Sequence, residues 1–220
     1  MKETLVIPFT KKFAGASHQD FLYGLLLHKL GMKALSVGDD FRFGHRALGD
    51  RHYLEEESRY AGFGLYLTRP LRFGGRAISS TRIRQLIERG DLSGAARMLG
   101  RPVSLYGTVV HGRGRGKSVG FPTANLDPHH ETLPKAGVYA AKGVLGRRRL
   151  LCVVHIGQRP TFRDTEKSVE VHFPGLRGSL YGREIEPFFL ERLRGIRRFS
   201  GKEALARQIR ADIRKARALF

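Results

Sequence analysis

The sequence has no tryptophan, one cysteine, and only half as many acidic residues as basic ones. A single cysteine excludes an internal disulfide, and Cys152 stands in an apolar run, which is typical of a small buried core residue. The longest apolar runs, Leu25 to Leu27 and Leu150 to Val154, are far too short to cross a bilayer, and the first residues lack the apolar stretch of a signal peptide. Low-complexity tracts and fixed-period repeats are also absent. We therefore expect a cytoplasmic globular protein with no membrane partner.

The composition that remains is that of a folded protein with an excess of positive charge. The 220 residues are 41% apolar and 27% charged, enough for one or two domains with a real core. The net charge of +20 attracts polyanions such as ATP or nucleic acid. Much of it lies in Arg147–Arg149 and in the tail from Arg192 to Arg217, which favours a solvated surface. We expect any nucleic-acid binding to be non-specific.

Residues 1–100 alternate between helix and strand patterns. Ser17 and Asp20 form a capping box before a helix with an apolar face, and residues 34–37 and 63–67 are predicted to be short strands, the first of them buried. Two more helices are predicted to begin at Ser79 or Ser80 and at Asp91. Strands that alternate with helices predict an α/β domain with a parallel sheet.

The pattern changes after residue 101, where we place the domain boundary. Short apolar runs predict strands at 105–110, 138–144, 150–156, 168–173 and 185–190. Short strands with little helix between them predict a small closed β-barrel for residues 101–220. Ser200 and Glu203 form a second capping box, before a final helix whose buried face would carry Leu205, Ile209 and Ile213.

The segment Gly112–Asn125 carries the clearest chemical signature. Four glycines alternate with three cations, and Thr123 then stands two residues before Asn125. Such a loop can turn its backbone N–H groups towards an anion. If 123–125 is extended, both side chains share one face and offer neutral oxygen ligands that suit Mg²⁺. The segment is neither a P-loop nor G-x-G-x-x-G, so chemistry alone supports a nucleotide-phosphate site and a flexible or RNA-binding loop equally.

The order of motifs along the chain resembles one family. The motifs are Gly107-Thr-Val-Val-His-Gly112, Gly116 to Leu126, Pro134-Lys-Ala-Gly-Val-Tyr139, His155-Ile-Gly-Gln-Arg-Pro-Thr-Phe162, Val169-Glu-Val-His172 and Leu180-Tyr-Gly182. They resemble the signature of riboflavin kinases. Upstream, Val37 to Gly44 and Ile78-Ser-Ser-Thr-Arg-Ile-Arg84 resemble the adenylyltransferase half of the bacterial bifunctional riboflavin kinase/FAD synthetases. The resemblance covers nearly the whole chain in order.

The resemblance implies a small Greek-key barrel with a C-terminal helix, and it implies roles for single residues. Thr123 and Asn125 match the ligands of Mg²⁺ and ATP, and Glu170 matches the carboxylate that accepts a proton from the ribityl 5′-hydroxyl of riboflavin. By itself, Glu170 would be an ordinary exposed strand residue. The implied ATP-binding residues of the kinase are Gly112, Arg115, Gly116, Lys117, Gly120, Pro122, Thr123 and Asn125.

Two positions depart from the family pattern. His155 stands where the family commonly has asparagine, and Phe173-Pro174-Gly175 stands where an acidic residue usually follows. Both positions lie near the implied flavin side, so these departures bear on riboflavin affinity rather than on ATP binding. His111 and His172 lack metal-ligand spacing, and we interpret them as structural.

For residues 1–100 the resemblance implies a Rossmann-like nucleotidyltransferase domain that acts on FMN and ATP. The implied ATP-phosphate residues are Ser79, Ser80, Thr81, Arg82 and Arg84, at a predicted helix N-terminus. The implied flavin-side residues are Asp40, Phe41 and Phe43. The family's G-x-F-D-G-x-H-x-G-H motif, whose histidines stabilise the transferring α-phosphoryl group, does not occur in these 220 residues. We therefore expect a shortened, incomplete domain.

Three hypotheses follow. The first is a riboflavin kinase, ATP + riboflavin → FMN + ADP, with Mg²⁺ as cofactor and an incomplete FAD synthetase (FMN adenylyltransferase) domain. The second is a fully bifunctional enzyme that receives the missing motif from elsewhere. The third is a basic nucleic-acid-binding protein on a degenerate enzyme scaffold, against which Thr123, Asn125 and Glu170 argue.

Overall fold

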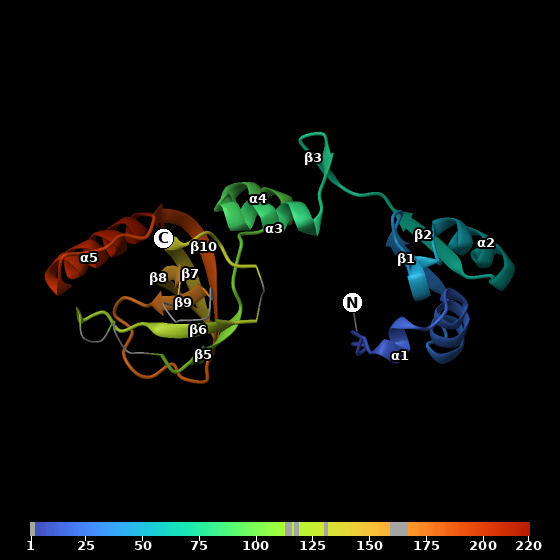
Figure 1. Ribbon diagram of the computed structural model, residues 1–220, viewed down its shortest axis with the longest axis horizontal. Coiled ribbons are helices and arrows are strands. Elements are labelled where there is room, and N and C mark those ends of the chain that lie inside the picture. The colour runs from blue at the N-terminus through green and yellow to red at the C-terminus, as the bar shows by residue number, and fades with distance from the viewer. Residues whose placement is uncertain (1–2, 113–115, 117–118, 130–131, 159–166) are drawn as a thin grey trace. The chain divides into compact units, whose positions relative to one another are not determined.

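The computed structural model describes residues 3–112, 116, 119–129, 132–158 and 167–220. Its contacts divide the chain into two compact units, Met1–Ala77 and Ile78–Phe220 (Figure 1). None of the helices in the described part of the chain is long and apolar enough to cross a membrane.

The first unit is built around a βαβ arrangement. Strands β1 (Ala34–Gly38) and β2 (Gly64–Thr68) pair in parallel, and helix α2 (Arg51–Ala61) connects them. Asp50 caps α2 by accepting a hydrogen bond from the Tyr53 N–H at 3.0 Å. This parallel pair agrees with the predicted α/β class. The remaining elements are α1 (Lys11–Ala14), the π-helix η1 (Asp20–Lys29), the 3₁₀-helix η2 (His45–Ala47), and the hairpin strands β3 (Arg72–Phe73) and β4 (Arg76–Ala77).

The core of this unit is small. Its buried apolar cluster, among the described residues, is formed by Leu22, Phe43, Leu54 and Phe63, and partly buried apolar side chains surround them. The prediction of a buried strand at 34–37 is wrong: β1 alternates between exposed and half-buried residues, because only one face of the two-stranded sheet is covered. The predicted cap is confirmed, since the Ser17 hydroxyl accepts from the Asp20 N–H at 2.9 Å.

The second unit contains a closed six-stranded antiparallel barrel, as the sequence predicts. Its strands are β5 (Gly107–Val110), β6 (Ala124–Pro128), β7 (Gly137–Leu145), β8 (Arg148–Gln158), β9 (Lys167–His172) and β10 (Glu184–Arg194). Around the barrel they follow the order β10-β5-β6-β9-β8-β7, and β7 closes the ring against β10. The consecutive strands β7, β8 and β9 are neighbours and β10 returns beside β7, which is a Greek-key arrangement.

Two short helices precede the barrel, α3 (Ser80–Arg89) and α4 (Leu92–Leu99), capped by Ser79 and Asp91 as predicted. Their apolar faces join the cluster of buried residues that fills the barrel. The contacts of the chain therefore divide at 77/78, upstream of the boundary near residue 101 that the change in pattern predicts. Where the two functional modules meet stays a prediction.

Helix α5 (Lys202–Ala218) lies along one side of the barrel (Figure 1). Its buried Ile213 and Ala216 pack on Val138, Ala140 and Val153, on the outer face of β7 and β8. The predicted inward face of this helix is confirmed at Ile213. The predicted capping box is wrong, because Gly201 is the N-cap residue and makes no side-chain hydrogen bond.

The attachment of α5 to the barrel includes a buried ion pair. Asp212 is 2% exposed and accepts hydrogen bonds from Arg194 Nε at 2.9 Å and from Gln208 Nε2 at 2.8 Å. Arg194 Nη2 lies 2.8 Å from the same carboxylate. Removing one partner of such a pair leaves a buried charge uncompensated, so this link fixes the position of α5 over β10.

Candidate active site

The pairing of the barrel strands places polar residues from distant parts of the chain in one row. Asn125 is opposite Glu170, Glu170 is opposite His155, His155 is opposite Val138, and Val138 is opposite Arg194. Directly paired residues point to the same side of a sheet. The sequence neighbours of the row fill the barrel interior, so the row lies on the outer face.

Thr123 stands just before β6, on the same side as Asn125, and its hydroxyl lies 3.4 Å from Glu170 Oε2. The two predicted oxygen ligands and the predicted base therefore meet at one point of the barrel surface, although 45 residues separate Asn125 from Glu170 in the sequence. Periodicity could not supply this contact, because it depends on the pairing of β6 with β9.

Two cavities meet at Thr123. The helix-side cavity, of about 430 Å³, lies between the row and α5, and apolar side chains from the barrel and from α5 line much of it. Glu170, His155 and Arg194 also face it. The strand-side cavity, of about 210 Å³, lies between β5, β6 and residues 176–181, and Asn125 lines it. Thr123 lines both cavities, so it stands where molecules held in the two cavities would meet.

Two glycines leave room for the oxygen ligands. A Cβ at Gly112 would lie 1.9 Å from Asn125 Nδ2, and one at Gly116 would lie 2.3 Å from the Phe121 carbonyl and 3.0 Å from Thr123 Oγ1. Contacts this short are forbidden, so only glycine lets the loop backbone approach the Asn125 and Thr123 side chains. Gly112 and Gly116 are therefore explained by close packing against neighbouring atoms, which the sequence alone did not reveal.

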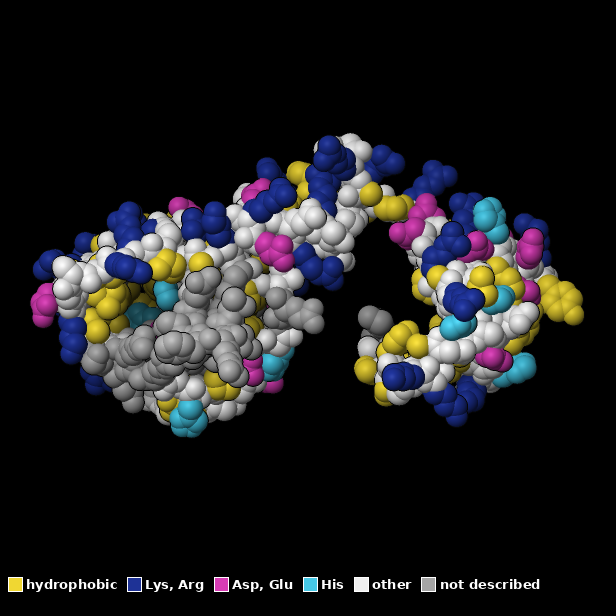
Figure 2. Space-filling model, in the orientation of Figure 1, with side chains coloured by type: hydrophobic (Ala, Val, Ile, Leu, Met, Phe, Trp, Pro, Cys, Tyr) yellow, Lys and Arg dark blue, Asp and Glu magenta, His cyan; other side chains and the backbone are white. Residues whose placement is uncertain are grey.

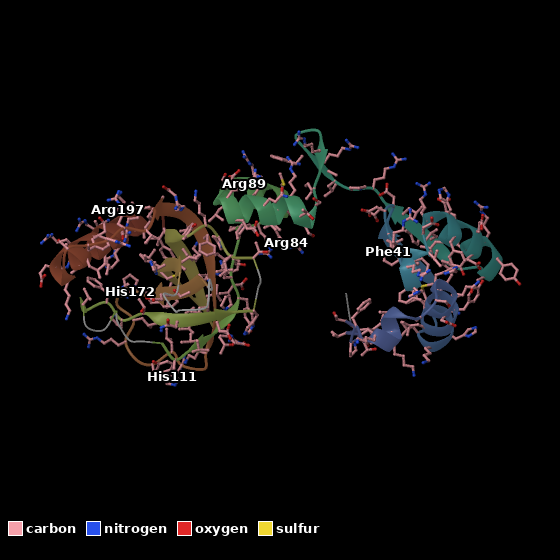
Figure 3. The ribbon with its side chains drawn as sticks, in the orientation of Figure 1. Phe41, Arg84, Arg89, His111, His172 and Arg197 are labelled. Atoms are coloured by element: carbon pink, nitrogen blue, oxygen red, sulfur yellow. The ribbon has the colours of Figure 1, made fainter. Side chains whose placement is uncertain are left out.

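His172 holds the segment that leads into β6. Its Nδ1–H donates to the Pro122 carbonyl at 2.8 Å, and its ring packs edge-on against Phe121 at 5.7 Å. His172 is labelled in Figure 3. Because its ring nitrogen is engaged with the backbone, its contacts are those of the structural residue that we expected. His111 stacks on Tyr181 at 4.0 Å, beside the strand-side cavity.

Burial shifts the pKa of two side chains on β8, His155 and Cys152. Loss of solvent lowers the pKa of His155, as does the nearby Arg194 charge, while Glu170 opposes both. His155 is therefore held towards its neutral form beside the Glu170 carboxylate. Cys152 points into the barrel interior, and burial raises the pKa of its thiol to about 12. The prediction of a buried core cysteine is thus confirmed.

Other predicted site residues have different surroundings. Arg115 and Lys117 fall outside the described residues. The hydroxyl of Ser79 accepts from the Arg82 N–H at 3.3 Å as the cap of α3; Ser80 and Thr81 are in the first turn of that helix, and Arg84 is its fifth residue. In the first unit, Asp40 is exposed, while Phe43 is buried and stacks on Phe41 at 5.5 Å.

The donor set decides what kind of metal could bind. No three His, Cys, Asp or Glu side chains come together among the residues that the structure describes. Thr123 and Asn125 instead offer neutral oxygens, in a place kept open by Gly112 and Gly116. Such a set fits Mg²⁺, which takes few protein ligands and keeps water and phosphate oxygens.

Sequence reasoning missed the apolar wall and the ion pair beside the helix-side cavity. Phe121, Phe199 and Ile209 line the cavity together with Arg194 and Asp212. Apart from Phe121, which lies in the motif Gly116 to Leu126, no motif marks these residues, and they meet because β10 is the neighbour of β7 and α5 folds back over both. Helical spacing of Ile209 with Ile213 was the one available signal.

Comparison with known proteins gives matches to both parts of the chain. A family model described as riboflavin kinase matches residues 99–220, and one described as FAD synthetase matches residues 1–82. The "Bifunctional riboflavin kinase/FMN adenylyltransferase" of Escherichia coli K12 is 38% identical over 217 residues, which are 98% of this chain and 69% of that protein. The protein of the same name from Haemophilus influenzae is 34% identical, over 98% and 70%.

One solved structure resembles the chain over both units. It is titled "Crystal Structure of Macrolide-efflux Protein from Streptococcus pneumoniae" and has a TM-score of 0.78 and 30% sequence identity. The match covers 95% of this chain and 67% of that one.

Proposed function

Because the chain belongs to the family of bifunctional riboflavin kinase/FMN adenylyltransferases, we propose that the outer-face row of its barrel transfers the γ-phosphoryl group of ATP to riboflavin. The chain is a riboflavin kinase with a FAD synthetase segment at residues 1–82. The observation that carries the proposed site is the contact of Thr123 with Glu170 at the junction of two cavities.

The two cavities differ in their lining, and the difference matches the flat apolar ring of riboflavin and the charged phosphates of ATP. The helix-side cavity is large enough for a flavin ring and is bounded by Val138, Val153 and Phe199, which suit a flat apolar ligand. The strand-side cavity adjoins Asn125 and the glycine-rich loop, which suits the nucleotide. We therefore assign riboflavin to the first and ATP to the second. The reacting hydroxyl and the γ-phosphate would then meet beside Thr123.

Glu170 is placed to act as the general base. The oxygen of the riboflavin 5′-hydroxyl forms a bond with the γ-phosphorus, the bond from that phosphorus to the ADP oxygen breaks, and the hydroxyl proton passes to the Glu170 carboxylate. The carboxylate faces the helix-side cavity and lies beside Thr123. His155, held towards its neutral form, adds no positive charge that would weaken the base.

Thr123 and Asn125 are the residues that would hold Mg²⁺ together with the ATP phosphates. When bound, the ion would neutralise negative charge on those phosphates. Gly112 and Gly116 keep the approach to both side chains open. Gly120 and Pro122 shape the turn before β6, and His172 fixes that turn through the Pro122 carbonyl. Arg115 and Lys117 remain proposed phosphate contacts on sequence grounds.

The adenylyltransferase residues also remain proposals. Ser79, Ser80, Thr81, Arg82 and Arg84 stand at the N-terminus of α3, where backbone N–H groups favour phosphate. Asp40 and Phe41 are the proposed flavin-side residues. Phe43 is buried and stacks on Phe41, so we propose that it holds the Phe41 ring in place rather than touching the flavin. We also place the enzyme in the cytoplasm, since a free buried Cys152 fits a reducing compartment.

The test is FMN formation from riboflavin, ATP and Mg²⁺ by the purified chain. Glu170→Gln keeps the size of the side chain but cannot accept the proton, and kcat should fall on the order of 10²-fold or more. Glu191→Gln removes the same charge from an exposed position on β10 and should leave kcat unchanged. Absence of FMN from folded protein would refute the kinase, and full turnover by Glu170→Gln would refute the assigned base.

A further inference from the structure

Helix α5 carries a stripe of arginines along one edge of its buried face, next to residues 120–122 and 172–176. Arg207, Arg210, Arg214 and Arg217 follow one another at intervals of three, four and three residues, and all four are exposed. This spacing keeps them on one face of the helix. With a rise of 1.5 Å per residue, the stripe is about 15 Å long. Figure 2 shows Lys and Arg side chains along the α5 side of the barrel.

The charge of this stripe is not neutralised by its own helix. Within α5 the acidic residues are Glu203 and Asp212, and Asp212 is engaged with Arg194 and Gln208. Among the described residues, none of the four arginines forms an ion pair. Like charges at such spacing destabilise a helix. The stripe therefore costs stability in the free protein, and a bound anion would relieve that cost.

A groove with an aromatic wall lies beside the stripe. A cavity of about 450 Å³ is lined by Arg210, Arg214 and Arg217 on one side, and by residues 120–122 and 172–176 on the other. The guanidinium carbon of Arg210 lies 5.9 Å from the centre of the Phe121 ring. A row of cations next to a wall with aromatic side chains is how proteins hold single strands of nucleic acid without reading sequence.

We propose that the arginine stripe and this groove bind single-stranded nucleic acid through its phosphates. A nucleic-acid strand carries regularly spaced phosphates, so several of them can contact a stripe of about 15 Å at once. A membrane surface fits less well, because membrane-binding helices expose an apolar face beside the basic one. The apolar face of α5 is buried against Val138, Ala140 and Val153. The groove shares Phe121 and His172 with the helix-side cavity, but none of the four arginines of the stripe lines that cavity.

The test compares two triple variants that change the net charge equally. One is Arg210→Gln/Arg214→Gln/Arg217→Gln in the stripe, and the other is Arg147→Gln/Arg148→Gln/Arg149→Gln, at the exposed β7–β8 turn and the start of β8. Binding of a labelled oligouridylate of about ten nucleotides is followed by fluorescence anisotropy at several salt concentrations. A third variant, Arg210→Lys/Arg214→Lys/Arg217→Lys, keeps the charge of the stripe. Circular dichroism and thermal unfolding check that each variant is folded.

Each phosphate contact on a single strand contributes about 0.7 to the slope of log K against log salt. The stripe variant should therefore lose about 2 from the magnitude of that slope, while the turn variant and the lysine variant keep nearly the whole of it. Equal losses in both glutamine variants would show that bulk charge alone attracts the strand, and would overturn the proposal. Tighter stripe-dependent binding to duplex DNA or to phosphatidylserine vesicles than to the oligouridylate would also overturn it.

Discussion

Replacing Gly112 with alanine should weaken the kinase by displacing one side chain. The new Cβ would lie 1.9 Å from Asn125 Nδ2 and 2.2 Å from its Cγ. Gly112 is exposed and does not have a positive φ, so alanine strains neither the backbone nor a core. The conflict is with the flexible end of Asn125, which will rotate away. Folding should survive, and the proposed ligand should be lost.

The size of the effect follows from the distance that Asn125 must move. Non-bonded heavy atoms need about 3.5 Å, so the amide has to retreat by about 1.5 Å. Misplacement of a positioning group by about 1 Å can cost on the order of 10²-fold in rate. We therefore expect kcat/KM for ATP at limiting Mg²⁺ to fall on the order of 10²-fold. The KM for riboflavin should change little, because Asn125 lines the strand-side cavity only.

The assay is FMN formation with varied ATP and Mg²⁺, and a double-mutant cycle identifies the cause. Asn125→Ala should lose about as much activity as Gly112→Ala, and the double variant should lose hardly more than either one, since both remove the same ligand. Gly24→Ala is the control, because a Cβ there meets nothing within 4 Å. Additive losses in the double variant would show that Gly112 acts through another group, and the steric explanation would be wrong.

Three further outcomes are expected. Burial lowers the pKa of His155, so below about pH 6.5 the unfolded chain takes up a proton that the folded chain resists, and the free energy of unfolding decreases as the pH is lowered. The variant His155→Asn should reduce this pH dependence, measured by urea unfolding between about pH 5 and 7, and an unchanged dependence would contradict the prediction. Cys152, whose thiol pKa is raised to about 12, should react with thiol reagents only as the protein unfolds, and rapid labelling of the native protein would show that the barrel opens. The 220-residue chain, incubated with FMN and ATP, should form little or no FAD by chromatography, because phosphate contacts at Ser79–Arg84 without donors to the α-phosphate do not raise the chemical rate; robust FAD formation would show that other groups supply those donors.

The elements that sequence could predict are those with local causes. Ser79 and Asp91 cap their helices because a side-chain oxygen reaches the N–H three residues later, which depends on nothing outside the turn. Five of the six barrel strands, all except β6, were predicted from apolar alternation or apolar runs in the same way. The predicted N-cap of α5 at Ser200 was wrong, although Ser200 and Glu203 have the spacing of a capping box. The helix begins after Gly201, so Glu203 is its second residue rather than its third and stays in the first turn as an acidic residue near the positive helix end.

The features that sequence could not predict depend on which strands become neighbours. Strand β6 carries Asn125 but has no clear alternation, since its apolar Leu126 is followed by Asp127 and Pro128. The spacing of Thr123 and Asn125 indicated two oxygen ligands on one face, but Glu170 was assigned only through the resemblance to a family, and its contact with Thr123 appeared only with the pairing of β6 and β9. The Arg194–Asp212 ion pair likewise depends on the return of α5 over β10.

The glycine-rich loop shows how one sequence pattern can hide separate physical causes. Gly120 has a φ of 85°, so it is required by backbone conformation. Gly112 is required because Asn125 occupies the space that a side chain would need, and Gly116 because the Phe121 carbonyl lies there. A Cβ at Gly116 would meet rigid backbone, whereas at Gly112 it would meet only a mobile amide. The two positions therefore differ in kind: alanine at 116 must displace the turn before β6, while alanine at 112 changes a proposed ligand and leaves the fold intact.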